Sequence, residues 1–160
     1  MRRSLLSSFL FALLLNILTG TALAAIPLTE REALVSLYEN TAGDSWINHS
    51  NWLGAEGTEC SWYGVVCNDD SSNVTELNLK ANHLRGQIPA NLTGLSQLGS
   101  NDLRFNAIYS DDIALVEFLG ASGPGGNLHD TQTLNPDGIN ISTVSDSGFT
   151  VSWTPVDYQQ

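Results

Sequence analysis

Two cysteines are the residues of this chain whose type and spacing most directly suggest covalent chemistry. Cys60 and Cys67 are the only two, and six residues separate them. Structural zinc pairs favour two to four intervening residues and need two further ligands, whereas the three histidines are dispersed. In an oxidising compartment, two nearby cysteines favour a disulfide. We therefore predict a Cys60–Cys67 disulfide, no metal site and no cofactor.

Patterns typical of catalysis are missing from the sequence. Ser, His and Asp residues are present, but no Gly-x-Ser-x-Gly elbow or metal-binding helix motif accompanies them. The Gly-rich stretch from Gly123 has no Gly-Lys-Ser/Thr to complete a phosphate loop. The adjacent carboxylates of Asp111 and Asp112 are explained by a helix start, where the macrodipole favours acids. We expect no catalytic residues and no enzymatic activity.

The net charge of the chain argues against a nucleic-acid partner. The formal charge is −11, and removal of Arg2 and Arg3 would leave four basic against 17 acidic residues, a balance of −13. Binding to nucleic acid depends on a Lys/Arg surface that releases counterions. We therefore expect no nucleic-acid partner.

The first 24 residues have the three parts of a secretory signal. Arg2 and Arg3 precede an apolar run from Leu5 to Leu18, and small residues follow at Ala22 and Ala24. A membrane anchor is the alternative, but the run is interrupted by polar residues and is shorter than the roughly 20 apolar residues of a spanning helix. We predict a signal peptide over 1–24, a secreted or cell-surface protein, and no transmembrane segment in the mature chain.

Residues 25–73 are expected to form a helix followed by an irregular, aromatic-rich segment. The capping-box pattern Thr-Glu-Arg-Glu at 29–32 precedes apolar residues at helical spacing, which predicts a helix from about Glu30 to Asn40. Three tryptophans, Trp46, Trp52 and Trp62, supply apolar area for a core. A valine pair before Cys67 indicates a short strand.

Residues 74–120 contain an internal repeat with a period of 24. The first copy has apolar residues and one asparagine at Val74, Leu77, Leu79, Asn82 and Leu84, and the second has Leu98, Asn101, Leu103, Asn106 and Ile108. Asn101 departs from the pattern, because an apolar residue is expected there. We expect Asn82 and Asn106 to satisfy backbone groups at a turn, and we assign them no ligand.

The repeats also predict which side chains face solvent. Leu77 and Leu79 alternate inward on a short strand, and stacked repeats place the intervening residues on one solvent-facing concave side. Mere solvation of these strand positions is the alternative to binding. The candidate binding residues are Glu76, Asn78, Lys80, Ser100, Asp102, Arg104 and Phe105.

The end of the repeat region should be a helix. Ser110 is the expected N-cap before an apolar run, and Gly120 is expected to end the helix. We predict a Gly/Pro linker over 121–130. The tail over 131–160 then alternates in a β manner from Gly138 to Trp153, with a turn at 145–148 and one apolar face made of Ile139, Ile141, Phe149, Val151 and Trp153. Two strands have little stability alone, so we expect an incomplete β-sandwich segment.

Two parts of the chain resemble known families. The helix, the tryptophan segment and Cys-Ser-Trp-Tyr-Gly-Val-Val-Cys at 60–67 resemble the N-terminal cap of plant-type leucine-rich-repeat proteins. Asn-His-Leu-Arg-Gly-Gln-Ile-Pro at 82–89 is similar to their repeat signature, and residues from about 131 resemble the first strands of a fibronectin type III domain. The resemblance implies an α/β solenoid with short parallel strands over 74–120, behind a cap over 25–73.

The same resemblance implies a function in recognition. It implies a secreted or cell-surface module whose concave face binds an extracellular protein or glycan. The alternative is a non-binding N-terminal remnant of a truncated multi-domain surface protein. Four Asn-x-Ser/Thr sequons, at Asn48, Asn73, Asn91 and Asn140, would be acceptors in a host that glycosylates its secreted proteins. The sequence names neither the ligand nor the host, nor the oligomeric state.

Overall fold

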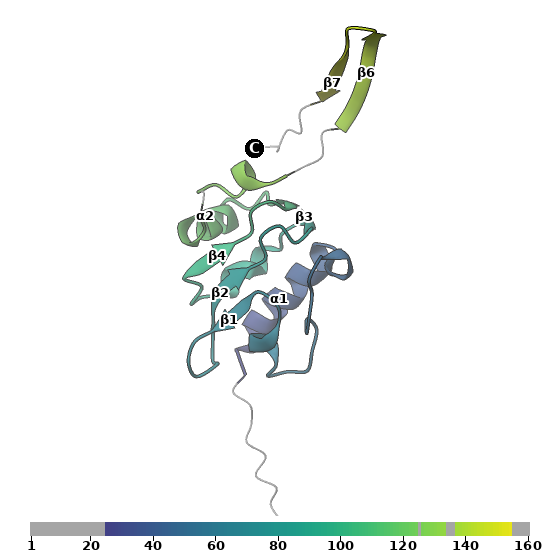
Figure 1. Ribbon diagram of the computed structural model, residues 1–160. Helices are drawn as coiled ribbons and strands as arrows, with labels where there is room; N and C mark the ends of the chain where they lie inside the picture. Colours follow the sequence, from purple (N-terminus) through teal and green to yellow (C-terminus); the bar gives the residue numbers. More distant parts are fainter. Residues whose placement is uncertain (1–24, 125, 134–136, 155–160) are drawn as a thin grey trace, which may run out of the picture.

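The computed structural model describes residues 25–124, 126–133 and 137–154. The expected signal peptide, 1–24, lies outside this range. The described chain forms a small stacked unit of helices and short sheets, from which a β-hairpin projects (Figure 1). No helix among the described residues is long and apolar enough to cross a membrane.

Helix α1, Leu28–Asn40, is the first element of the unit. Its type was predicted correctly, but the capping box was wrong, because Pro27 stands at the N-cap and no side chain caps the helix. Glu30 is instead turned inward and buried, and its carboxylate accepts hydrogen bonds from the Val74 N–H at 2.7 Å and from Asn73 Nδ2 at 2.8 Å. This acid therefore ties the helix to the start of the first repeat.

An aromatic cluster fills the irregular segment between α1 and the sheet. Trp52 packs on Tyr38, Trp46 and Trp62, with ring centroids 4.8 to 5.8 Å apart, and all four rings are buried. Short 3-10 helices η1, Gly43–Ser45, and η2, Glu59–Ser61, carry the chain around this cluster. The predicted Cys60–Cys67 disulfide is confirmed beside it. The cap aromatics thus belong to the same buried cluster as the leucines of the repeats.

The main sheet has the strand order β1-β2-β4 (Figure 1). Strand β1, Val65–Cys67, is antiparallel to β2, Val74–Asn78, and β2 is parallel to β4, Ser100–Asp102. Glu76 pairs with Ser100 and Leu77 with Asn101, which confirms the 24-residue repeat. A second pair of parallel strands follows the main-sheet strands, one in each repeat. It consists of β3, Arg85–Gln87, and β5, Ala107–Tyr109.

The core lies between the main sheet and the elements behind it. Leu77, Leu79, Leu84 and Ile108 are fully buried, together with Leu92 of the 3-10 helix η3, Ala90–Gly94. Helix α2, Ile113–Ser122, closes the stack and contributes buried Leu115 and Leu119. Its N-cap is Asp112, which accepts from the Leu115 N–H, rather than the expected Ser110, and the helix continues past Gly120.

Asn101 has a structural role that the repeat pattern did not predict. Its side-chain amide is buried and donates to the Leu119 carbonyl and to the Ser122 hydroxyl, both at 2.8 Å. Carbonyl groups at the end of a helix lack intrahelical partners. Asn101 therefore replaces an apolar core residue with a group that holds the C-terminal end of α2 against β4.

The segment after α2 packs on the second repeat and is not an extended linker. Leu128 is buried, the Phe105 N–H donates to the Thr131 carbonyl at 2.8 Å, and the Thr133 N–H donates to the Asn106 carbonyl at 2.6 Å. A hollow of about 10 Å³ lies between this segment and Leu103, room for about one water molecule. We call residues 123–124 and 126–133, which include the 3-10 helix η4, His129–Thr131, the closing segment. The Gly/Pro linker expected over 121–130 is therefore wrong in its bounds, because residues 121 and 122 end α2 and the packed segment continues to Thr133.

The tail forms one hairpin of β6, Asp137–Ser145, and β7, Gly148–Thr154. Its register places Ile141 opposite Val151 and Asn140 opposite Ser152, so apolar and polar residues lie on opposite faces. The apolar face is exposed, with Ile139, Ile141 and Phe149 each at 60% or more. The alternation was therefore predicted correctly, and no second sheet covers this face within the described residues.

Candidate functional site

The predicted binding residues come together on the outer face of β2, β4 and the turns that follow them. We call these seven residues the concave patch: Glu76, Asn78, Lys80, Ser100, Asp102, Arg104 and Phe105. Asn78, Lys80, Ser100 and Phe105 are exposed, and the other three are half-buried. Leu77 and Leu79, between them in sequence, are fully buried, so the inward and outward positions follow the predicted alternation.

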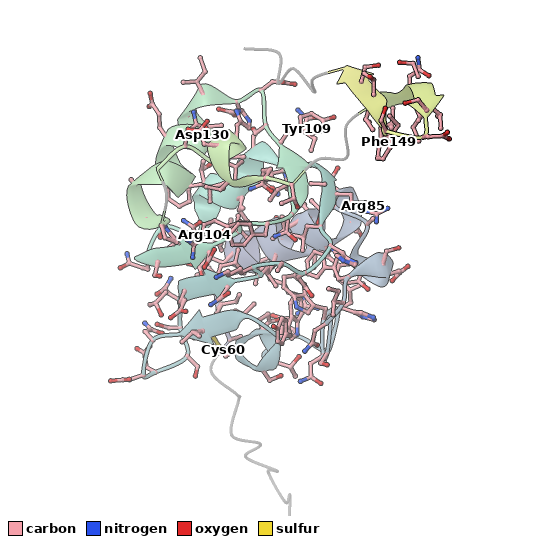
Figure 2. The ribbon with its side chains drawn as sticks, turned by 45° about the horizontal axis from the view of Figure 1, so that its top comes forward. Cys60, Arg85, Arg104, Tyr109, Asp130 and Phe149 are labelled. Carbon is pink, nitrogen blue, oxygen red and sulfur yellow. A yellow bond between two sulfur atoms is a disulfide. The ribbon has the colours of Figure 1, made fainter. Side chains whose placement is uncertain are left out.

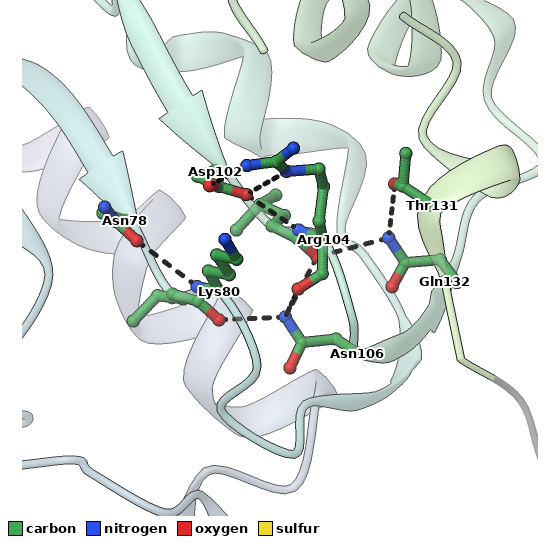
Figure 3. A network of polar contacts seen from close by, with 9 residues as sticks. Asn78, Lys80, Asp102, Arg104, Asn106, Thr131 and Gln132 are labelled. Carbon is green, nitrogen blue, oxygen red and sulfur yellow. Dashed lines mark hydrogen bonds and ion pairs between the residues drawn. The ribbon is translucent and has the colours of Figure 1, made fainter. Parts of the chain in front are cut away.

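An ion pair fixes the centre of the concave patch. Arg104 donates to Asp102 through Nε at 2.9 Å and through Nη2 at 2.8 Å, and its backbone N–H donates to the same carboxylate at 3.2 Å (Figure 3). These hydrogen bonds lower the pKa of Asp102, and the same contact raises the pKa of Arg104. A two-point Arg–carboxylate pair holds both side chains in a defined geometry. Asp102 and Arg104 therefore present a rigid polar surface.

Phe105 lies next to this pair and contacts two cations. The Lys80 ammonium is 5.3 Å and the Arg104 guanidinium 5.7 Å from the centre of its ring, within the range of cation–π attraction. The ring is 46% exposed. Sequence reasoning placed these three residues on one face but did not predict their mutual contacts, which depend on the turn after each strand.

The backbone of Phe105 is itself unusual. Its φ of 59° lies in the left-handed region, and Ala81, at the matching position of the first repeat, has a φ of 51°. This conformation costs free energy for a residue other than glycine. The repeat turn imposes this left-handed backbone at both positions. In the second repeat, the residue in this conformation is a large aromatic one, Phe105.

Buried asparagines hold the turns beneath the concave patch. Asn106 accepts from the N–H groups of Asn82 and Leu84 and donates to the Leu79 carbonyl at 2.9 Å. Its amide nitrogen also donates to the Arg104 carbonyl at 3.4 Å (Figure 3). Asn82 makes an equivalent pair of bonds with the backbone of Asn48. Both side chains are at most 3% exposed. The structure thus agrees with their assignment as backbone-satisfying groups.

Two charged residues missed by sequence reasoning stabilise the cap rather than a site. Glu59 is buried and forms an ion pair with Arg31, which also donates to the Gly54 carbonyl at 2.8 Å. Arg31 lies over the Trp62 ring as well. Burial of a charge is costly unless it is paired, so these contacts explain why Glu59 is tolerated in the core. In the part of the chain that the structure describes, no group of three or more His, Cys, Asp or Glu residues could hold a metal ion.

Comparison with known proteins gives partial matches to plant receptor-like protein kinases. The chain is 35% identical over 104 residues to the LRR receptor-like serine/threonine-protein kinase FEI 2 of Arabidopsis thaliana, covering 64% of this chain and 17% of that protein. It is 41% identical over 58 residues to the leucine-rich repeat receptor-like protein kinase PXC1 of the same plant, covering 36% of this chain and 8% of that protein. No family model matches the chain. No solved structure matches it either.

These matches and the fold together indicate which class of repeat the chain contains. The paired parallel strands repeat every 24 residues with buried leucines and asparagines, and the relatives are leucine-rich-repeat proteins. The chain therefore contains a leucine-rich-repeat-like region. It spans less than a fifth of the length of these relatives.

Proposed function

We propose that the chain is a secreted or cell-surface interaction module whose concave patch binds an extracellular protein or glycan. The observation that carries this proposal is the arrangement of Phe105 beside the Asp102–Arg104 pair on the outer face of the main sheet. Aromatic and arginine side chains dominate the binding energy of many interfaces. The relatives named as receptor-like proteins and the signal pattern over 1–24 support an extracellular location.

Catalysis has no part in this proposal. The matched relatives are named as kinases, but the chain covers 17% or less of the two described above. The carboxylates of Asp111 and Asp112 lie at the start of α2, where Asp112 caps the helix. The charged groups of the concave patch are better suited to recognition than to proton transfer, because Asp102 is held ionised by Arg104.

A binding screen with a matched pair of variants tests the proposal. The secreted protein would be applied to arrays of extracellular proteins and glycans, and each hit would be measured again with Phe105→Ala and Tyr109→Ala. Tyr109 is 40% exposed and lies on β5, outside the concave patch. Alanine fits the left-handed backbone at 105, because Ala81 adopts it in the first repeat.

The two variants give opposite expectations. We expect Phe105→Ala to weaken the hits by about tenfold or more, as for an interface anchor, and Tyr109→Ala to leave them unchanged. Hits that depend on Tyr109 and not on Phe105 would contradict a concave binding surface. The amino-terminal sequence of the secreted protein tests the location, with Ala25 expected as the first residue.

The hairpin supports a second proposal about organisation. We propose that β6 and β7 are the first strands of a fibronectin type III-like sandwich, in which case the repeat unit is an N-terminal part of a multi-domain surface protein. Their exposed apolar face, with Ile141 at 61% and Phe149 at 68%, is what one layer of a sandwich presents to the other. Genomic sequence downstream of the codon for Gln160 tests this. A reading frame with further alternating strands is expected, and its absence would leave the hairpin without the proposed second layer.

A further inference from the structure

The β-hairpin carries a strand edge without the charges that usually prevent pairing with another chain. Along 137–154 the sequence contains no lysine, arginine or proline, and its two acids are Asp137, at the start of β6, and Asp146, in the turn. Natural proteins protect a free strand edge with charged residues, proline, bulges or a covering segment. The middle of the nine-residue strand β6 therefore has no charge that would keep a second strand away.

The hairpin also stands apart from the rest of the described structure. It projects beyond the closing segment (Figure 1), and Figure 2 shows Phe149 on it, apart from the repeat unit that carries Arg104 and Cys60. Large apolar side chains remain exposed on both strands, with Ile141 at 61% and Phe149 at 68%. A two-stranded ribbon is marginally stable alone and needs a third strand or another packed element. Addition of a strand would therefore stabilise the hairpin, and its edge has room for one.

Two arguments select β6 as the pairing edge and a second copy of the chain as the partner. In two-layer sandwiches of the immunoglobulin type, the first strand lies at the edge of its sheet, whereas the second strand has a neighbour on both sides. The chain has a net charge of −11, so a basic partner would be attracted to its acidic surfaces, whereas two copies repel each other there. The uncharged centre of β6 is a place where two copies can meet without this repulsion.

The register of the hairpin indicates where the two copies pair. Asn140, Ile141 and Ser142 lie opposite β7 without a shift, and the register shifts on both sides of this stretch. A bulge bends a strand, so the regular part of β6 is centred on Ile141, which is also the middle residue of Asp137–Ser145. Antiparallel pairing of β6 with itself about this centre places Ile141 opposite Ile141 of the second copy. It also keeps the apolar faces of both hairpins on the same side.

We propose that β6 pairs reversibly with β6 of a second copy of this chain. The result is a four-stranded antiparallel sheet in the order β7-β6-β6-β7, with a two-fold axis at Ile141 and one continuous apolar face. Each copy contributes the strand that the other hairpin lacks. The pair carries two concave patches, which raises the avidity for a ligand that offers repeated sites. The inference rests on the proposed sandwich for the choice of edge and does not depend on ligand binding.

A cysteine at the two-fold axis tests the proposal. Residues directly opposite each other in an antiparallel pair have Cα atoms about 4.5–5.5 Å apart, which is within the range for a disulfide. Ile141→Cys should therefore cross-link two copies under mild oxidation, since Cys60 and Cys67 are already bonded to each other. Val151→Cys is the matched control, because Val151 is opposite Ile141 on β7 but would lie about 14 Å from its counterpart in the second copy. Non-reducing gels measure the cross-linking.

Paired lysine variants test the same edge without a cross-link. Sedimentation over a wide concentration range measures the monomer–dimer equilibrium, on protein from a host without N-glycosylation because Asn140 begins a sequon. Asn140→Lys with Ser142→Lys should weaken the dimer by about fivefold or more, because the lysines of the two copies lie opposite each other. Thr150→Lys with Ser152→Lys adds the same charge to the same face on β7 and should leave the dimer as stable as that of the wild type. Circular dichroism would verify that each variant is folded.

The outcomes decide between pairing through β6 and other arrangements. Cross-linking at position 141 but not at 151, with a dimer weakened only by the β6 lysines, supports the proposal. A wild-type chain that stays monomeric would overturn it, as would equal cross-linking at the two positions. A dimer weakened by the β7 lysines, or by neither pair, would place the contact on another surface and overturn it too. The Phe105 dependence of array hits and the downstream reading frame are measured separately, so the earlier proposals stand or fail independently.

Discussion

The Tyr38 hydroxyl donates a hydrogen bond to Asp44 Oδ1 at 2.7 Å, although the tyrosine ring itself is buried against Trp46 and Trp52. Burial, and next the hydrogen bond to Asp44, raises the pKa of Tyr38 from 10.0 to about 12. The folded state thus disfavours the tyrosinate form. Gly43 lies so close to the face of this ring that an added Cβ would be 2.3 Å from it, which fixes the phenol in place.

This arrangement predicts a loss of stability at alkaline pH. An unfolded tyrosine loses its proton near pH 10, whereas Tyr38 retains it to about 12, so its contribution to stability falls as pH rises through this window. Tyr38→Phe should be less stable than wild type at pH 8, and the difference should shrink between pH 10 and 12. Thermal melts across this range provide the measurement. The exposed Tyr63→Phe is the control, and a similar shrinkage there would contradict the assignment to Tyr38.

The disulfide should contribute to stability beyond its short loop. Cys60 and Cys67 are seven residues apart and flank Trp62, which is 1% exposed. We expect Cys60→Ser to lower the free energy of unfolding by roughly 2–5 kcal/mol, as for native bridges in small secreted domains. Urea melts with and without reductant measure this. The reductant should affect only the wild-type protein, and two free thiols in the secreted protein would end the prediction.

The strand register predicts opposite effects at neighbouring positions. Leu79 is fully buried and Asn78 is exposed. Leu79→Asp would place an unpaired charge in the core and should prevent folding or cost at least about 3 kcal/mol, whereas Asn78→Asp should change stability by about 0.5 kcal/mol or less. Denaturant melts compare the two. Equal losses would mean that the inward and outward positions are exchanged.

The closing segment predicts where protease cuts. Leu128 is buried and the backbone of residues 131 and 133 is bonded to the second repeat, whereas the hairpin is largely exposed. Exposed segments with few contacts are cut first. We expect early cleavage within 137–154 and a resistant fragment that retains Leu128 and ends near Thr133, as mass spectrometry would show. A fragment that ends near Leu119 would mean that the closing segment is detached in solution.

The parts of the fold that follow from local pattern were predicted from the sequence. The alternation of Leu77 and Leu79 gave the buried face of β2, and the 24-residue period gave its pairing with β4. Six residues of the concave patch follow from the same alternation, whereas Phe105, directly after Arg104, is displayed by the left-handed turn. The short spacing of Cys60 and Cys67 gave the disulfide. Each of these depends on residues close in sequence or on a regular period, which a single sequence displays.

The parts that depend on distant contacts were not predicted. Glu30 reads as an exposed first-turn acid, yet it bonds to Val74, 44 residues away. From the sequence, Asn101 is a polar residue at an apolar position of the second repeat. The structure shows that it bonds to the end of α2. The closing segment has the composition of a linker, and the burial of Leu128 and the backbone bonds to the second repeat show that it packs. In each case tertiary packing provides a partner that local propensity cannot anticipate.

The two ends of the repeat stack differ from its middle in a way that bears on how such a protein could lengthen. One edge of the main sheet is held by β1 and the aromatic cluster, and the other by Asn101 and the closing segment. A further repeat added after β4 would have to displace residues that fill its outer edge. A 24-residue module inserted between β2 and β4 would meet a parallel strand on both sides and leave the two ends unchanged. Each such insertion would widen the concave face by about 4.8 Å. Growth of the array is therefore favoured from the interior, with both terminal layers kept as fixed boundaries.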